Sequence, residues 1–118
     1  SSDLSNPDNP DVYFNVGIIY QRLASNLYEE TVSEYNALIK EDIPSASSIQ
    51  TAHTHCIETL DMVKLALNYF MDASMLEEDE NTDTETAMKD MKRLRKNIKN
   101  IYIGSIEQIA KDYKITLD

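Results

Sequence analysis

Apolar residues recur every three or four positions along most of the chain, which is the spacing of one face of an α-helix. The pattern predicts four helices, at about residues 10–42, 46–76, 84–103 and 106–114. No segment alternates apolar and polar residues for long enough to predict a strand. We therefore expect an all-α helical bundle, built on a long antiparallel helical hairpin with a third helix and a short C-terminal helix.

The first helix has a sequence signal at each end. Asn9 can cap the free amides, and Pro10 suits the first helical position because it has no N–H to leave unpaired. Ile43-Pro44 ends the helix, since proline disfavours helical geometry in the residue before it. Its apolar residues form one line and a second line beside it: Val12, Val16, Ile19, Leu23 and Leu27, then Tyr13, Tyr20, Ala24, Tyr28, Val32, Tyr35 and Ile39.

The second helix begins within residues 45–48 and, like the first, is about 30 residues long, or roughly 45 Å at helical rise. Two such helices joined at Ile43-Pro44 form an antiparallel hairpin. Residues 10–118 are expected to make a single domain. The polar residues 1–9 are expected to form a flexible arm before it.

Residues 77–85 read EEDENTDTE and contain six acids, no base and no apolar side chain. Like charges at this density repel one another and stay solvated, which predicts an exposed acidic loop. Thr82 and Glu85 have the spacing of a capping box, so the third helix should begin nearby.

Gly104 and Ser105 interrupt the pattern of the third helix. Glycine commonly closes a helix, and Ser105 with Gln108 has capping-box spacing, so we expect a kink or short break before the last helix. The segment from Ser105 to Thr116 resembles the first helix and turn of a helix-turn-helix module, which needs a second helix to enter the major groove. No second helix follows before Asp118, so either the sequence is cut there or the segment is only a short amphipathic helix, which is the interpretation we favour.

The composition narrows the class of protein. With 42% apolar residues, two glycines and three prolines in 118 residues, the chain has too few turn residues for a β-sandwich and too many apolar ones for disorder. No apolar run approaches the roughly 18 residues of a membrane span, and we expect no secretory leader, because residues 1–9 contain no cationic, apolar-cored segment. The single Cys56 favours a reducing compartment. We expect a soluble, cytoplasmic protein without membrane contact.

The charge is unevenly distributed. The net charge is −10, but residues 1–86 carry −14 and residues 87–114 carry +5. Nucleic acid could be bound only where bases gather, because affinity comes from neutralised phosphates. The alternative is a solvated face partly neutralised by the acidic hairpin. The candidate phosphate or nucleic-acid contacts lie on the third helix: Lys89, Lys92, Arg93, Lys96 and Lys99.

Carboxylates gather at helical spacing on both helices of the hairpin. If the hairpin closes in register, Glu30 and Glu34 meet Glu58 and Asp61 and offer oxygen ligands for Mg²⁺. The pattern Glu29-Glu30-x-x-x-Glu34 followed by Glu58-x-x-Asp61 resembles the all-α nucleotide pyrophosphohydrolases of the MazG type, whose first motif is one residue shorter. The resemblance implies Mg-dependent hydrolysis. A solvated acidic face is the simpler interpretation in so acidic a chain.

A second possible ligand cluster combines His53, His55, Cys56 and Glu58. The two histidines project about 200° apart on a helix, so they do not bind one ion. Cys56 has no assigned His or Asn partner to activate it. We expect packing roles for these side chains, with no cofactor, no metal and no catalytic residue.

The motif Tyr13-x-x-Val16-Gly17-x-x-Tyr20 resembles the first helix of a tetratricopeptide repeat, in which glycine lets neighbouring helices pack closely. The rest of the repeat is not matched, because Glu29 stands where the repeat has a small residue. A close helix contact over the glycine explains the motif equally well.

Tyrosines at intervals of seven and eight residues mark the first helix. They form either the edge of the core or a surface for a partner, since tyrosine is enriched at interfaces. Two 45 Å helices with one further helix to cover them should leave apolar surface exposed. We therefore expect a non-enzymatic interaction or assembly module that self-associates or binds a protein. The alternative is an acidic inhibitor or antitoxin-like protein that covers a basic surface. The candidate partner-binding residues are Tyr13, Tyr20, Tyr28, Tyr35, Glu77, Glu78, Asp79 and Glu80.

Overall fold

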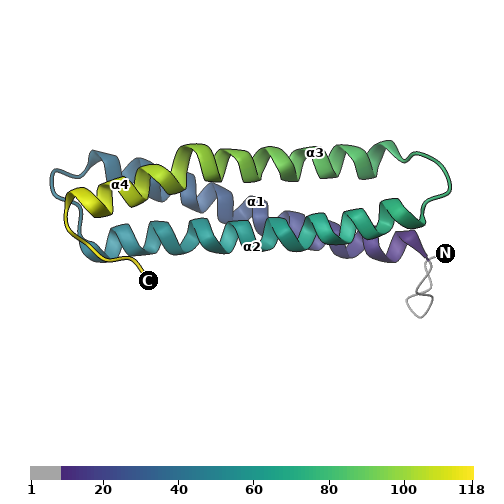
Figure 1. The fold of residues 1–118 in the computed structure, drawn as a ribbon, viewed down its shortest axis with the longest axis horizontal. Helices are drawn as coiled ribbons and strands as arrows, with labels where there is room; N and C mark the ends of the chain where they lie inside the picture. Colours follow the sequence, from purple (N-terminus) through teal and green to yellow (C-terminus); the bar gives the residue numbers. More distant parts are fainter. Residues whose placement is uncertain (1–8) are drawn as a thin grey trace.

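The computed structural model describes residues 9–118, and the all-α helical bundle is confirmed. Apart from Asn9, the expected arm lies outside the described residues. The order of elements along the chain is α1 (Pro10–Lys40), α2 (Ala46–Leu76), α3 (Thr82–Asn97), the π-helix η1 (Ile98–Ile103) and α4 (Gly104–Asp112). Helices α1 and α2 form the hairpin, and α3, η1 and α4 run end to end beside it (Figure 1).

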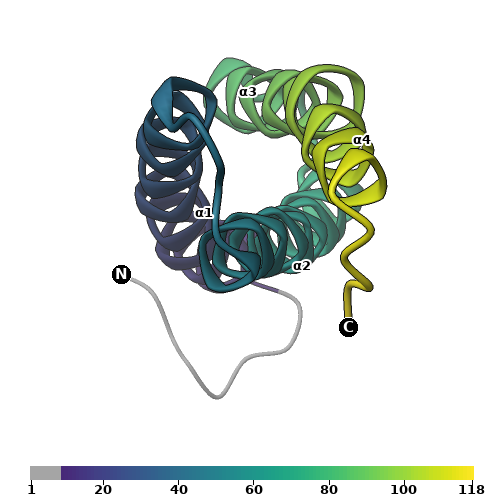
Figure 2. The same cartoon turned by 90° about the vertical axis from the view of Figure 1, so that its left-hand side faces the viewer.

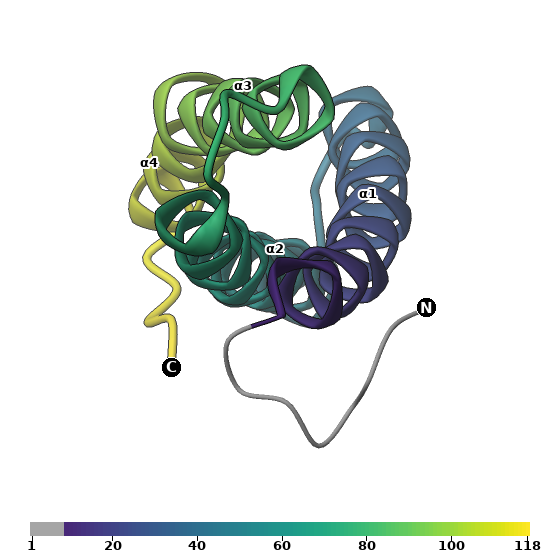
Figure 3. The ribbon, with the colours of Figure 1, turned by 90° about the vertical axis from the view of Figure 1, so that its right-hand side faces the viewer.

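We call the continuous segment from Thr82 to Asp112 the C-terminal rod. Viewed along the bundle, α1, α2 and this rod surround a common axis (Figure 2 and Figure 3). The molecule measures 55 × 23 × 19 Å. Three packed helical rods of this length leave a large part of each helix facing outward.

Side-chain caps define the helix starts. The Asn9 carboxamide oxygen accepts from the Asp11 amide at 3.0 Å, and the Ser45 hydroxyl accepts from the Ser48 amide at 3.0 Å. Both starts agree with the prediction. Helix α1 ends at Lys40 rather than at residue 42, because the backbone of Glu41 is extended, with φ −77° and ψ 137°.

The third helix begins earlier than predicted, at Thr82 instead of residue 84, and the acidic loop is correspondingly shorter. Asn81 is its N-cap and accepts from the amides of Asp83 and Thr84 at 2.9 and 3.3 Å. The expected capping box of Thr82 and Glu85 does not form. An Asn side chain one position earlier already satisfies the free amides.

The helix does not break at Gly104, but the expected irregularity before the last helix is present as the π-helix η1. Gly104 has helical φ and ψ of −63° and −41°, and the Ser105 hydroxyl donates to the Ile101 carbonyl at 2.7 Å instead of capping a helix. The buried residues Ile98 and Ile106 are eight positions apart, which in an α-helix would turn them about 80° away from each other. The wider turn of η1 takes up the extra residue and keeps both on the core side.

The rod ends at Asp112, two residues before the predicted end. The Ile115 amide donates to the Ala110 carbonyl at 2.8 Å and the Lys114 amide to the Lys111 carbonyl at 3.1 Å, which together make a Schellman motif. Lys114 takes the left-handed position with φ 56°. Ile115 then folds back onto the core.

The core has two clusters along the bundle axis. One surrounds Phe70 and Met91, and the other surrounds Ile49, Cys56 and Ile98. Helix α1 contributes small or medium side chains at seven-residue intervals, which let α2 approach closely. These inward positions of α1 are Gly17, Ala24, Thr31 and Leu38.

Candidate functional site

Two of the five residues of the first apolar line predicted for α1 are exposed, and none of the five is fully buried. Ile19 is 57% exposed and Leu23 is 45% exposed, while Val12 and Val16 are half-buried. The core side of α1 is formed instead by its small residues and by the second predicted line, including Tyr20 and Tyr28. We call Val12, Val16, Ile19 and Leu23 the outer line of α1.

Along α1 itself, charged residues are nearly absent next to the outer line, although Asp72 of α2 lies beside Tyr13 at its start. Between residues 12 and 28, Arg22 is the single charged residue, in a chain with 27% charged residues. Exposed apolar side chains without nearby charges are the surface type that proteins cover with a partner. The outer line is therefore the strongest candidate contact surface on α1.

Three of the four tyrosines of α1 pack their rings against other aromatic rings of the bundle. Tyr20 stacks on Tyr69 of α2 with ring centroids 5.6 Å apart. On the other side of α1, Tyr28 and Tyr35 each meet Tyr102 edge to face, at 5.9 and 5.4 Å. They do not form one partner-facing surface.

The hydroxyl groups of Tyr28 and Tyr102 have polar neighbours inside the bundle. Tyr28 accepts a hydrogen bond from the Asn97 side chain at 3.3 Å. Burial, together with the nearby Tyr28 hydroxyl, raises the pKa of the Tyr102 phenol. Tyr13 lies apart from these residues, beside a shallow pocket that Asp72, Met75 and Leu76 also line. Tyr28 also borders an open depression, which Val32, Ala37 and Lys40 line with it, so two of the four tyrosines lie beside open surface features.

The bases of the rod face outward. We call Lys89, Lys92, Arg93, Lys96 and Lys99 the basic stripe, and all five are exposed. Ala87 and Met91 are buried on the opposite side of the helix. Among residues 9–118, the one ion pair made by a Lys or Arg joins Arg93 to Asp90, its neighbour on α3. No base of the stripe therefore forms a direct ion pair with the acidic hairpin in the described residues.

The acidic segment is a tight connection between α2 and α3. Glu77 accepts a hydrogen bond from the Thr84 hydroxyl at 3.2 Å, so it braces the start of α3. Glu78, Asp79 and Glu80 are exposed. These three carboxylates are the ones free to meet a basic surface.

The four carboxylates that could have gathered at the centre of the hairpin do not do so. Glu30 and Glu34 of α1 come together with His55 of α2, and the ligand atoms of these three residues all lie within 4.8 Å of one another. Glu58 and Asp61 are exposed and do not belong to this group. The rotation of α2 brings an imidazole, and not its acids, opposite the carboxylates of α1. The resemblance to MazG-type enzymes therefore lacks its four-carboxylate site.

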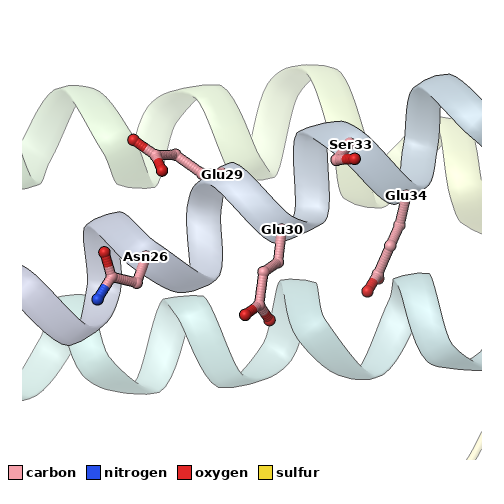
Figure 4. Close-up of a pocket in the computed structure, with 5 residues that line it drawn as sticks. All are labelled: Asn26, Glu29, Glu30, Ser33 and Glu34. Atoms are coloured by element: carbon pink, nitrogen blue, oxygen red, sulfur yellow. The ribbon is translucent and has the colours of Figure 1, made fainter.

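The geometry of this group is visible from the outside of α1. Glu30 and Glu34 both extend toward α2, whereas Glu29 points the other way (Figure 4). His55 Nδ1 lies 2.7 Å from each carboxylate oxygen of Glu34. A shallow depression lined by Glu29, Glu30 and Glu34, with Asn26 and Ser33, leaves the carboxylates open to solvent.

His53 faces a different neighbour, as its projection from the helix predicts. Its Nε2 lies 3.4 Å from a carboxylate oxygen of Glu107 on α4, and its Nδ1 is buried without a hydrogen-bond partner in the described part of the chain. Cys56 is fully buried. Burial, together with the charges of Glu34 and Glu107, raises the pKa of its thiol to about 11. At neutral pH the thiol is therefore protonated and is a poor nucleophile.

The fold matches neither the resemblance to a tetratricopeptide repeat nor the resemblance to a helix-turn-helix module. Gly17 packs against Phe70 inside a single hairpin, without the stacked helix pairs of a repeat array. In α4, Ile106 and Ala110 are buried and the helix continues α3 directly. The glycine is explained by the contact with Phe70 alone.

No helix in residues 9–118 is long and apolar enough to cross a membrane. A comparison with known proteins found no matching family model, curated protein or solved structure. The function is therefore argued from the surfaces of this chain.

Proposed function

We propose that this protein is a non-enzymatic assembly module that self-associates through the outer line of α1. The observation that carries the proposal is the exposure of Ile19 and Leu23, four residues apart on a helix whose opposite side is in the core. Each large apolar side chain left in water forgoes roughly 1.5–3 kcal/mol of burial free energy. A partner that covers the line recovers part of this free energy.

Charge supports a second copy of the chain as that partner. With a net charge of −10, two copies repel each other over most of their surfaces. Along α1, Arg22 is the one charge between residues 12 and 28, so two copies can meet over this part of the helix without bringing acids of α1 together. A two-fold contact places this surface against itself, as most homodimers do.

The experiment replaces Ile19 and Leu23 together by lysine and measures the mass by light scattering over a range of protein concentrations. The unmodified chain is expected to approach twice its monomer mass of 13.5 kDa. The double variant should be monomeric, with its dissociation constant raised at least about tenfold, because two buried charges replace two apolar contacts. Its stability as a monomer should change by less than about 0.5 kcal/mol.

The matched control places the same two charges elsewhere on α1, as Ser33→Lys with Asn36→Lys, where both side chains are exposed. It should keep the mass of the unmodified chain. Association through apolar surface also persists at high salt, because screening weakens only charge pairs. A monomer at every concentration contradicts the proposal. Association that disappears at high salt contradicts it too, and favours charge-driven contacts of Glu78, Asp79 and Glu80.

A second candidate function is contact with a nucleic acid through the basic stripe. It is favoured by one observation, the outward orientation of these bases away from the acidic hairpin. Phosphate neutralisation by clustered Lys and Arg side chains supplies most non-specific affinity for nucleic acid. The remaining negative charge of the chain opposes this binding, so it should be detectable only at low salt.

The test measures fluorescence anisotropy of a labelled 20-base-pair DNA at 50 mM salt. Lys92→Glu with Lys96→Glu should weaken binding more than about tenfold. The control, Lys40→Glu with Lys64→Glu, changes the net charge equally but at exposed positions of the hairpin, and should keep most of the affinity. Equal losses in both variants, or no binding by the unmodified chain, would show that the stripe is only a solvated surface.

A further inference from the structure

The group of Glu30, Glu34 and His55 has the composition of a metal site. It combines two carboxylates and one imidazole from two helices, with all ligand atoms within 4.8 Å of one another. The two carboxylates lie one helical turn apart on α1, and the imidazole comes from the facing turn of α2. This arrangement gives three ligands on one side of an ion.

We propose that Glu30, Glu34 and His55 bind a divalent transition-metal ion of the zinc type. Imidazole nitrogen with carboxylate oxygen suits zinc and its neighbours in the first transition series, whereas Mg²⁺ prefers oxygen ligands and retained water. Ligand atoms about 2.1 Å from zinc lie roughly 3.4 Å apart in a tetrahedron. The ligand atoms of the three residues, all within 4.8 Å of one another, lie near this spacing.

The negative charge of the two carboxylates also favours the binding of a cation. In residues 9–118, neither Glu30 nor Glu34 forms an ion pair with a Lys or Arg, and His55 is the basic side chain in contact with Glu34. Two adjacent carboxylates repel each other, and one imidazole compensates them only partly. A divalent ion balances both carboxylates at once.

Exposure determines which type of zinc site this is. Glu30 is exposed, and Glu34 and His55 are half-buried beside the depression on α1. Three protein ligands with an open side leave at least one coordination position for water or for another molecule. The ion would also link α1 to α2 at the middle of the hairpin.

Within residues 9–118, His53, the other histidine of α2, has no comparable set of ligands around it. Its ring meets one carboxylate, that of Glu107, and no further His, Cys, Asp or Glu completes a three-ligand group there in the described part of the chain. The two histidines therefore provide a matched pair, one with a ligand set and one without.

The experiment titrates the full chain with ZnCl₂ by isothermal titration calorimetry and records the visible spectrum with Co²⁺ as a spectroscopic substitute. One Zn²⁺ per chain is expected, with Mg²⁺ giving no competing binding at equal concentration. His55→Gln and Glu34→Gln should each weaken Zn²⁺ binding more than about tenfold. Even mutation of a group that only hydrogen-bonds a metal ligand lowers metal affinity by about ten- to a hundredfold. Glu30→Gln should weaken it as well.

Two control variants leave the group intact. His53→Gln removes the other histidine, and Glu29→Gln removes the neighbouring carboxylate that points away (Figure 4). Both should retain the affinity and the Co²⁺ spectrum, and circular dichroism confirms that each variant is folded. No saturable Zn²⁺ binding, or binding that survives His55→Gln, would overturn the proposal.

The site goes beyond the proposed self-association and does not depend on it. The variant with Ile19→Lys and Leu23→Lys should bind Zn²⁺ as the unmodified chain does, because all three ligands come from one chain. Loss of Zn²⁺ binding in this variant would contradict a site held by a single chain. Unchanged Zn²⁺ binding by a chain that never dimerises would leave the metal site standing and refute only the assembly.

Discussion

Replacing Phe70 with alanine is expected to lower the free energy of unfolding by about 3–5 kcal/mol. The side chain is fully buried, lies at the centre of one core cluster and packs against the Phe14 ring at a centroid distance of 5.6 Å. Its removal leaves a cavity between α1, α2 and α3, which long, straight helices do not fill by small movements. Urea unfolding followed by circular dichroism, at one protein concentration, measures the loss.

The contact between Phe70 and Gly17 can be tested by combining Phe70→Ala with Gly17→Ala. A Cβ atom at Gly17 would lie 2.6 and 2.7 Å from two ring carbons of Phe70, so Gly17→Ala alone should cost about 1–3 kcal/mol by overpacking. In the Phe70→Ala background the clash is absent, and alanine should instead stabilise α1 by up to about 1 kcal/mol. The effect of Gly17→Ala therefore changes sign between the two backgrounds.

Gly104 provides the control for this double-mutant cycle. It is exposed, has helical backbone angles, and an added Cβ would have no neighbour within 4 Å. Gly104→Ala should stabilise the protein by up to about 1 kcal/mol with either residue at position 70. If the effect of Gly17→Ala were equally additive, the close contact of α1 with Phe70 would not exist.

Deleting Asn100 is expected to leave the bundle intact and change its stability by less than about 1 kcal/mol, although the deletion lies within a helix. Asn100 is exposed in η1, the segment that holds one residue more than an α-helical turn. Without it, Ile98 and Ile106 would be seven residues apart, and an ordinary α-helix keeps such residues within about 20° of each other. Both would remain in the core.

Deleting Lys64 is the matched control, because this exposed residue lies in the regular helix α2. The deletion turns the two halves of α2 about 100° relative to each other, so Val63 and Phe70 no longer face the same core. The loss should exceed about 4 kcal/mol or prevent folding. Urea unfolding compares the two deletions, and comparable losses would show that η1 does not compensate for an inserted residue.

Sequence reasoning predicted the helices that local signals define. Asn9 with Pro10 identified the start of α1, because the capping partner lies two residues away. The start of α2 was placed within residues 45–48, where the structure shows Ser45 to be the cap. Sequence reasoning failed at Gly104, where a glycine and a capping-box spacing pointed to a break. The choice there depends on whether Ile106 reaches the core, which is a contact with α2 and not a local preference.

The candidate sites were less predictable than the helices. Glu30 and Glu34 could be grouped from their spacing, because residues four apart share a helix face. Their partner His55 could not be identified, since it comes from another helix whose rotation no local pattern reports. The basic stripe was visible as a pattern, but its outward orientation depends on Ala87 and Met91 packing into the bundle.

The sequence by itself determined the all-α class, the long hairpin and the separation of acidic from basic segments, because helical periodicity, caps and charges are properties of neighbouring residues. Only the tertiary structure decided which apolar line of α1 is buried and which side chains of α2 face Glu30 and Glu34. The physical reason is the close packing of Gly17 against Phe70, part of the contact that sets how α1 and α2 face each other. That rotation leaves Ile19 and Leu23 exposed and brings His55 to the two carboxylates.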